Sequence, residues 1–136
     1  MEAACQAAAT AAGLGGNWQA WIGTQNNVPA TRFVHGTIPY VLVNGPEIAM
    51  DWSGLTSGTL ESPIDRDETG AQITTPLPAV WTGVRADGTT VGGECGNWSV
   101  GTMNGWVGSA VDGSMNWSMY AGNTCATKNR LYCFEQ

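Results

Sequence analysis

Positive charge is scarce in this chain. Only five of the 136 residues are lysine or arginine, against eleven aspartates and glutamates, and the formal net charge is −6. The five cations are scattered along the sequence rather than clustered. Nucleic acids, heparin-like polyanions and anionic membrane surfaces attract clustered cations. The composition therefore argues against all three classes of partner.

Long apolar runs are also lacking, and the chain has a single histidine. No run is long enough to span a bilayer, so we expect no membrane insertion. Residues 2–14 are alanine-rich but have no basic start, so they do not read as a signal peptide. We expect the chain to be the C-terminal part of a longer secreted or surface protein. A catalytic triad would have to use His35, the only histidine, which we expect to be a turn or packing residue.

The four cysteines include no C-x-x-C pair, which argues against a zinc knuckle or a thioredoxin motif. An even number of cysteines in a glycine-rich, lysine-poor chain indicates two disulfides and an oxidising compartment. Three pairings are open, and spacing alone does not choose among them. The length suits one domain over residues 1–136, with no linker.

Local patterns predict one helix and several short strands. Alanine predominates over residues 2–12, and glycines follow, which predicts a helix with a defined end. A short helical or irregular segment is expected at 46–55, and tight turns at Asn44-Gly45 and Asp87-Gly88. The expected strands are 18–24, 32–34, 40–43, 79–84 and 130–135. Between them lie two long segments, 53–78 and 92–125, which we expect to be loops; long loops on small domains are often functional.

Several stretches, in this order, resemble C-type-lectin-like domains. An early cysteine-bearing helix, a W-I-G strand, a W-x-G strand and a final L-Y-C-F-E strand are all present. The likeness is closer to endostatin, the C-terminal domain of collagens XV and XVIII, and to bacterial endostatin-like domains. It covers almost the whole chain. The matching stretches are Cys5 with residues 11–21, then 38–41, 51–58, 80–88, Cys95 with Trp98, and 131–135.

This resemblance implies an α+β fold of the C-type-lectin-like, endostatin type. One or two short helices would lie against a twisted, mainly antiparallel sheet, with long disulfide-pinned loops. It implies a nested pairing, Cys5 with Cys133 and Cys95 with Cys125. The histidine zinc site of endostatin does not carry over, because this chain lacks those histidines.

The resemblance also bears on function. A scaffold that holds variable loops suits binding rather than catalysis. Bacterial endostatin-like proteins resemble binders of host-matrix and complement proteins, which makes a protein partner an option. Display at the tip of a fibre, as a homotrimer, is a further expectation.

The tryptophans of the second long segment are candidate ligand contacts. Indoles among asparagines suit neutral sugars, and aromatic residues are favoured at binding hot spots. Packing in the core is the alternative for each tryptophan. We expect the binding surface to use segments 53–78 and 96–124. The candidate residues are Trp98, Trp106, Trp117, Asn97, Asn104, Asn116 and Tyr120.

Acidic residues raise two further hypotheses. Asp65, Asp67 and Glu68 could bind calcium through one loop, although solvated loop charge is the alternative and the E-P-N, Q-P-D and W-N-D motifs of sugar-binding C-type lectins are absent. Paired carboxylates could cleave glycosides, although no spacing singles out a pair.

Taken together, these observations lead us to expect an extracellular adhesion or recognition domain for a neutral glycan or a protein, without cofactor. The alternatives are a carbohydrate-active hydrolase or a purely structural extracellular domain.

Overall fold

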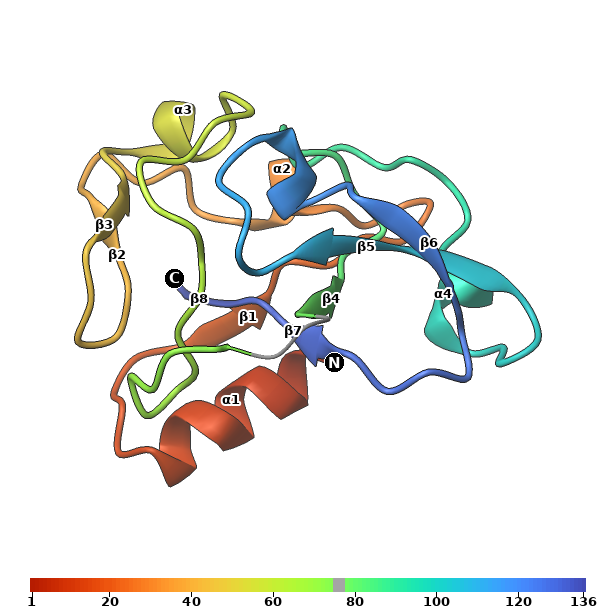
Figure 1. Cartoon of the computed structure of the whole chain (residues 1–136), viewed down its shortest axis with the longest axis horizontal. Helices are drawn as coiled ribbons and strands as arrows, with labels where there is room; N and C mark the ends of the chain where they lie inside the picture. Colours follow the sequence, from red (N-terminus) through yellow and green to blue (C-terminus); the bar gives the residue numbers. More distant parts are fainter. Residues whose placement is uncertain (75–77) are drawn as a thin grey trace.

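The computed structural model describes residues 1–74 and 78–136 (Figure 1). Short helices alternate with short strands along the chain, and no element exceeds ten residues. The order is α1 (Glu2–Ala11), β1 (Trp18–Ala20), α2 (Pro29–Arg32), β2 (Tyr40–Val41), β3 (Glu47–Ala49), α3 (Trp52–Leu55), β4 (Ala79–Trp81), α4 (Cys95–Trp98), β5 (Asn104–Ser109), the 3₁₀ turn η1 (Met115–Trp117), β6 (Ala121–Thr124), β7 (Arg130–Leu131) and β8 (Cys133–Glu135).

The described strands form three small sheets. The largest has the order β6-β5-β4-β7, in which only the β4–β7 pair is parallel. β1 pairs antiparallel with β8, and β2 pairs antiparallel with β3 in a hairpin. Because β7 and β8 are separated by a single residue, the last segment of the chain belongs to two sheets at once. The expected α+β class with few helices and mainly antiparallel strands is confirmed.

Helix α1 is anchored to the neighbouring sheet by its polar side chains. Alanine is the best helix former, and Gly13, with a φ of +74°, ends the helix as expected. The Glu2 carboxylate accepts a hydrogen bond of 2.8 Å from the backbone N–H of Ala20. The Gln6 side chain accepts one of 2.9 Å from the N–H of Trp18. The helix thereby covers the outer edge of β1.

Two disulfides hold the ends of the chain and the second long segment. Cys5 of α1 is bonded to Cys133 of β8, and Cys95 is bonded to Cys125, which is the nested pairing that the resemblance implied. No cysteine is free. Two disulfides are typical of proteins that fold in an oxidising, extracellular environment. Of the helices in the described residues, none has the length and apolar character needed to cross a membrane.

The core is centred on Trp21. Its ring lies 4.9–6.0 Å from four other aromatic rings, measured between centroids, and its side chain is completely buried. A second cluster surrounds the two disulfides and includes Trp81. The rings around Trp21 are those of Phe33, Trp52, Trp117 and Phe134.

Some local expectations are wrong and others hold only in part: the strands expected at 18–24, 40–43 and 79–84 are shorter than predicted. Residues 32–34 do not form a strand, because Pro29 opens the short helix α2 that ends at Arg32. Segment 92–125 is not all loop, since it contains β5 and β6 paired over four positions. The predicted segment 46–55 divides into β3 and α3. Both tight turns are confirmed by backbone hydrogen bonds, Gly45 N–H to the Leu42 carbonyl and Gly88 N–H to the Arg85 carbonyl.

Candidate functional site

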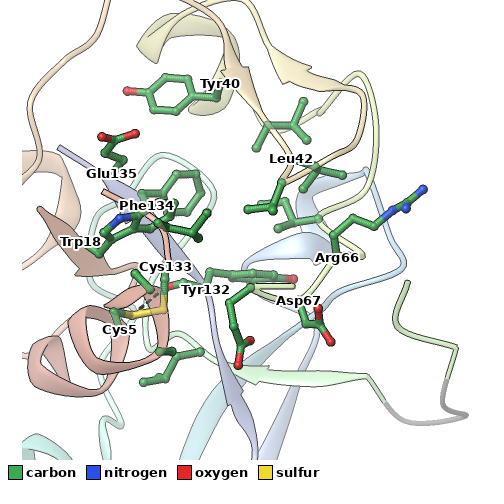
Figure 2. Close-up of a pocket in the computed structure, with 18 of the residues that line it drawn as sticks. Cys5, Trp18, Tyr40, Leu42, Arg66, Asp67, Tyr132, Cys133, Phe134 and Glu135 are labelled. Atoms are coloured by element: carbon green, nitrogen blue, oxygen red, sulfur yellow. Dashed lines mark hydrogen bonds between the residues drawn. A yellow bond between two sulfur atoms is a disulfide. The ribbon is translucent and has the colours of Figure 1, made fainter. Parts of the chain in front are cut away.

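A cleft of about 770 Å³ opens between α1, the β2–β3 hairpin, residues 64–73 and the final strands β7 and β8 (Figure 2). Its size falls within the range of ligand-binding cavities in proteins. Part of the long segment 53–78 forms one wall, while residues 75–77 of that segment lie outside the described residues.

The floor of the cleft is apolar and rigid. Tyr132 and Phe134 are buried, and Figure 2 shows their rings on one side of the final strand, with the Cys5–Cys133 bridge on the other side next to α1. This alternation follows from the two-residue period of a strand. Ile48 of β3 also contributes a buried side chain to the lining. A floor fixed by a disulfide and by core packing is a preformed surface.

Helix α1 supplies a wall of small side chains. Ala4 and Ala8 are four residues apart, so they lie on one face of the helix, and both line the cleft. Cys5 and Ala9, one position further on in each case, are buried beneath them. The alanines leave open space where larger residues would fill the cleft.

The opposite rim exposes large apolar side chains. Val34, Ile38 and Val41 line the cleft, yet they are 64%, 73% and 64% exposed. Water-exposed apolar groups around an apolar hollow mark interaction sites in many proteins. This rim makes the cleft the candidate binding site among the described residues.

Charged groups gather at the end of the cleft formed by residues 66–68. Asp67 is held in its own turn, where its Oδ1 accepts hydrogen bonds from the hydroxyl and the N–H of Thr69 and from the N–H of Ala71. These bonds, that of the Thr69 hydroxyl foremost, lower the pKa of Asp67. The Arg66 guanidinium donates to the Gly70 carbonyl, and Figure 2 shows it directed away from Tyr132. Both side chains are therefore engaged in shaping the loop.

The hydroxyl of Tyr132 is held within the floor of the cleft. Burial strongly raises the pKa of Tyr132, so its hydroxyl stays protonated at physiological pH. That hydroxyl donates a hydrogen bond of 3.0 Å to the carbonyl of Trp117. Neither feature provides a group poised to give or take a proton near neutral pH.

The seven residues predicted to bind a ligand do not line this cleft. Trp117 has no exposed surface and packs against Trp21 and Tyr132, so the structure assigns it to the core rather than to a binding surface. Trp98 is half-buried, packs on Trp81 and donates a 2.8 Å hydrogen bond to the carbonyl of Gly23. These two tryptophans serve packing.

The other predicted residues are spread over several elements. Asn104 and Trp106 share one face of β5, where the half-buried indole lies opposite Gly122 of β6. Tyr120 is 60% exposed just before β6. Asn116 donates a hydrogen bond to Asp112, and Asn97 is exposed on α4. Only Asn104 and Trp106 are placed together by the sheet register.

Two of the acidic residues predicted to bind calcium, Asp65 and Asp67, are hydrogen-bonded to neighbours in their own loop. Asp65 accepts a hydrogen bond from Gln72 and lies 3.6 Å from the Nε of Arg66, while Asp67 bonds within its own turn. Within residues 1–74 and 78–136, no group of three or more His, Cys, Asp or Glu side chains is positioned to hold a metal ion.

Sequence reasoning missed the cleft. One signal was present: residues 38–43 read Ile-Pro-Tyr-Val-Leu-Val, an apolar run too long for a two-stranded hairpin that is open to water. Such a run requires a covering surface, in the same chain or in a partner. In comparisons with known proteins, no family model and no curated protein matches this chain.

Proposed function

We propose that this chain is a C-type-lectin-like domain of the endostatin type that acts outside the cell as a recognition domain. In this proposal its ligand is a segment of another protein, held in the cleft between α1 and the β2–β3 hairpin. The order of the matching stretches and the nested disulfides support the family assignment. The two disulfides support an extracellular location.

One observation carries the choice of site. The apolar cleft has a preformed floor and a rim on which Val34, Ile38 and Val41 remain largely exposed. Leaving three such side chains in water has a free-energy cost of about 25 cal/mol per Å² of apolar surface. A ligand that covered them would recover that free energy.

A protein ligand fits this lining better than a glycan. Sugar recognition needs several hydrogen-bonding side chains that converge on the hydroxyl groups, together with an open aromatic ring. In the cleft most lining residues are apolar, and Asp67 is already bonded within its loop. Trp117, one of the indoles that we predicted to contact a sugar, is buried.

The test uses a library of random peptides displayed on phage, selected against the whole domain. We expect apolar peptides that bind the unaltered domain and bind Val41→Asp and Ile38→Asp at least tenfold more weakly, since a carboxylate at the rim would be desolvated. Val111→Asp is the matched control, because Val111 is 51% exposed and lies outside the cleft. Peptides that bind all four proteins equally would contradict the proposed site, and binding on a glycan array that depends on Trp106 would contradict the proposed ligand.

A further inference from the structure

Within the part of the chain that the structure describes, the backbone hydrogen bonds of β8 lie on one edge only. The N–H of Gln136 donates to the carbonyl of Asn17, and the carbonyl of Tyr132 accepts from the N–H of Trp21. Gln19 is the register partner of Phe134 between them. In an antiparallel ladder, the backbone groups of alternate residues point to opposite edges. Those of residues 132, 134 and 136 therefore face β1, and those of Cys133 and Glu135 face away from it.

The two outer edges of the β1–β8 sheet differ in their hydrogen bonding. On β1, the outward N–H groups of Trp18 and Ala20 are bonded by Gln6 and Glu2 of α1. On β8, no described residue bonds to the N–H of Cys133, the carbonyl of Cys133 or the N–H of Glu135. The carbonyl of Glu135 accepts only from the side-chain amide of the adjacent Gln136. Among residues 1–74 and 78–136, one edge is capped by the protein itself, and the other has no backbone partner.

The open edge lies along the cleft. Cys133 and Glu135 both line it, with Ala4 and Ala8 of α1 on one face of the strand. On the other face is Tyr40, whose ring lies 5.9 Å from that of Phe134. Figure 2 shows the final strand running between α1 and Tyr40. Backbone groups without partners beside apolar walls form a template for one more strand.

We propose that the bound protein segment is extended and pairs with Cys133 and Glu135 as an added β-strand. This inference rests on the proposed function and specifies the conformation of the ligand. Strand addition supplies backbone hydrogen bonds, and side chains on the two faces of the added strand enter different surroundings. One set packs against the alanines of α1, and the alternate set packs against Tyr40 and the hairpin. The segment is apolar on both faces, and it is neutral or basic overall because the chain carries a net charge of −6.

Backbone methylation of a bound peptide tests this conformation directly. A peptide selected against the domain is resynthesised with one N-methyl group at each successive position. We expect methylation at every second position of the central segment to weaken binding at least tenfold, while the positions between are tolerated. Loss at a spacing of three to four residues, or no periodic loss, would overturn strand addition while leaving the cleft as the site.

Amide hydrogen exchange on the domain gives an independent readout. Addition of the peptide should slow the exchange of the Cys133 and Glu135 N–H groups at least tenfold. The N–H groups of Gln136 and Trp21 are already bonded, so their exchange is the internal control. Unchanged exchange at Cys133 and Glu135 with a bound peptide would refute the strand pairing alone. If the selection yields no peptide that binds in the cleft, both the strand pairing and the proposed function are wrong.

Discussion

The indole Nε1 of Trp21 donates a hydrogen bond of 2.8 Å to the hydroxyl of Ser118, a residue 97 positions later in the chain. That hydroxyl donates in turn to the carbonyl of Val84, at 3.0 Å. The carbonyl of Ser118 accepts a 2.6 Å bond from the hydroxyl of Thr82. The side chains of Trp21, Thr82 and Ser118 are completely buried. This network joins the chain after β1, the chain after β4 and the chain after η1 inside the core.

Replacing Ser118 by alanine should destabilise the domain, because the substitution leaves the buried Nε1 of Trp21 without an acceptor. We expect the free energy of unfolding to fall by about 1–3 kcal/mol. Urea denaturation followed by tryptophan fluorescence measures it. Ser53→Ala is the control, since Ser53 is exposed. Equal stabilities for the two variants would show that the network contributes nothing.

The outer disulfide should contribute more stability than the inner one. Cys5 and Cys133 are separated by 128 positions, and Cys95 and Cys125 by 30. Loop entropy in the unfolded chain then gives about 5 kcal/mol and about 3.5 kcal/mol respectively. Thermal unfolding of the two double-alanine variants, one for each bridge, compares them. A larger loss on removing the inner bridge would contradict this ordering.

Gly108 should not tolerate a side chain. A Cβ placed there would lie 1.9 Å from the backbone carbonyl oxygen of Trp117, so Gly108→Ala must displace η1 from β5. We expect a loss of about 1–3 kcal/mol in the free energy of unfolding. Gly122→Ala on the neighbouring strand β6 is the matched control, because a Cβ there meets no atom within 4 Å. The account is wrong here if both variants unfold at the same denaturant concentration.

Asp112 should make part of the stability sensitive to acid. Hydrogen bonds from Ser114 and then from Asn116 lower its pKa in the folded state. A lowered folded pKa adds stability above the ordinary value of about 3.9, and this is lost as the pH falls through the folded pKa. Asp112→Asn should therefore be less stable than the unaltered domain at pH 6, and the difference should shrink as the pH falls below about 3.9. Melting temperatures across this range provide the test, and a difference that did not change with pH would argue against it.

The elements that could be predicted from the sequence are those that depend on local composition. Helix α1 follows from its alanines and the glycines behind it, and the final strands follow from their apolar residues. Strands β5 and β6 contain Asn104, Gly105, Gly122 and Asn123, which disfavour strands, and they form because each pairs with the other. Their existence is decided by tertiary contacts.

Two identical tripeptides show that local sequence also does not decide which side chains are buried. Asn97-Trp98-Ser99 and Asn116-Trp117-Ser118 have the same letters, yet Trp98 is half-buried and Trp117 is completely buried. What separates them is contact with Trp21, which is distant in sequence. The position of the cleft could not be predicted from local sequence for the same reason, because its walls come from four segments that only the fold brings together.

A pair of tryptophan substitutions on α1 tests the central claim, that the cleft is the binding site. Ala8 lines the cleft, whereas its neighbour Ala7 is exposed and does not, so Ala8→Trp fills the cleft while Ala7→Trp has the same cost in helix propensity. The measurement is the affinity of both variants for a peptide selected against the unaltered domain, with near-UV circular dichroism to verify folding. We predict that Ala7→Trp binds as the unaltered domain does and that Ala8→Trp binds at least tenfold more weakly. Undiminished binding by a correctly folded Ala8→Trp domain would contradict the account.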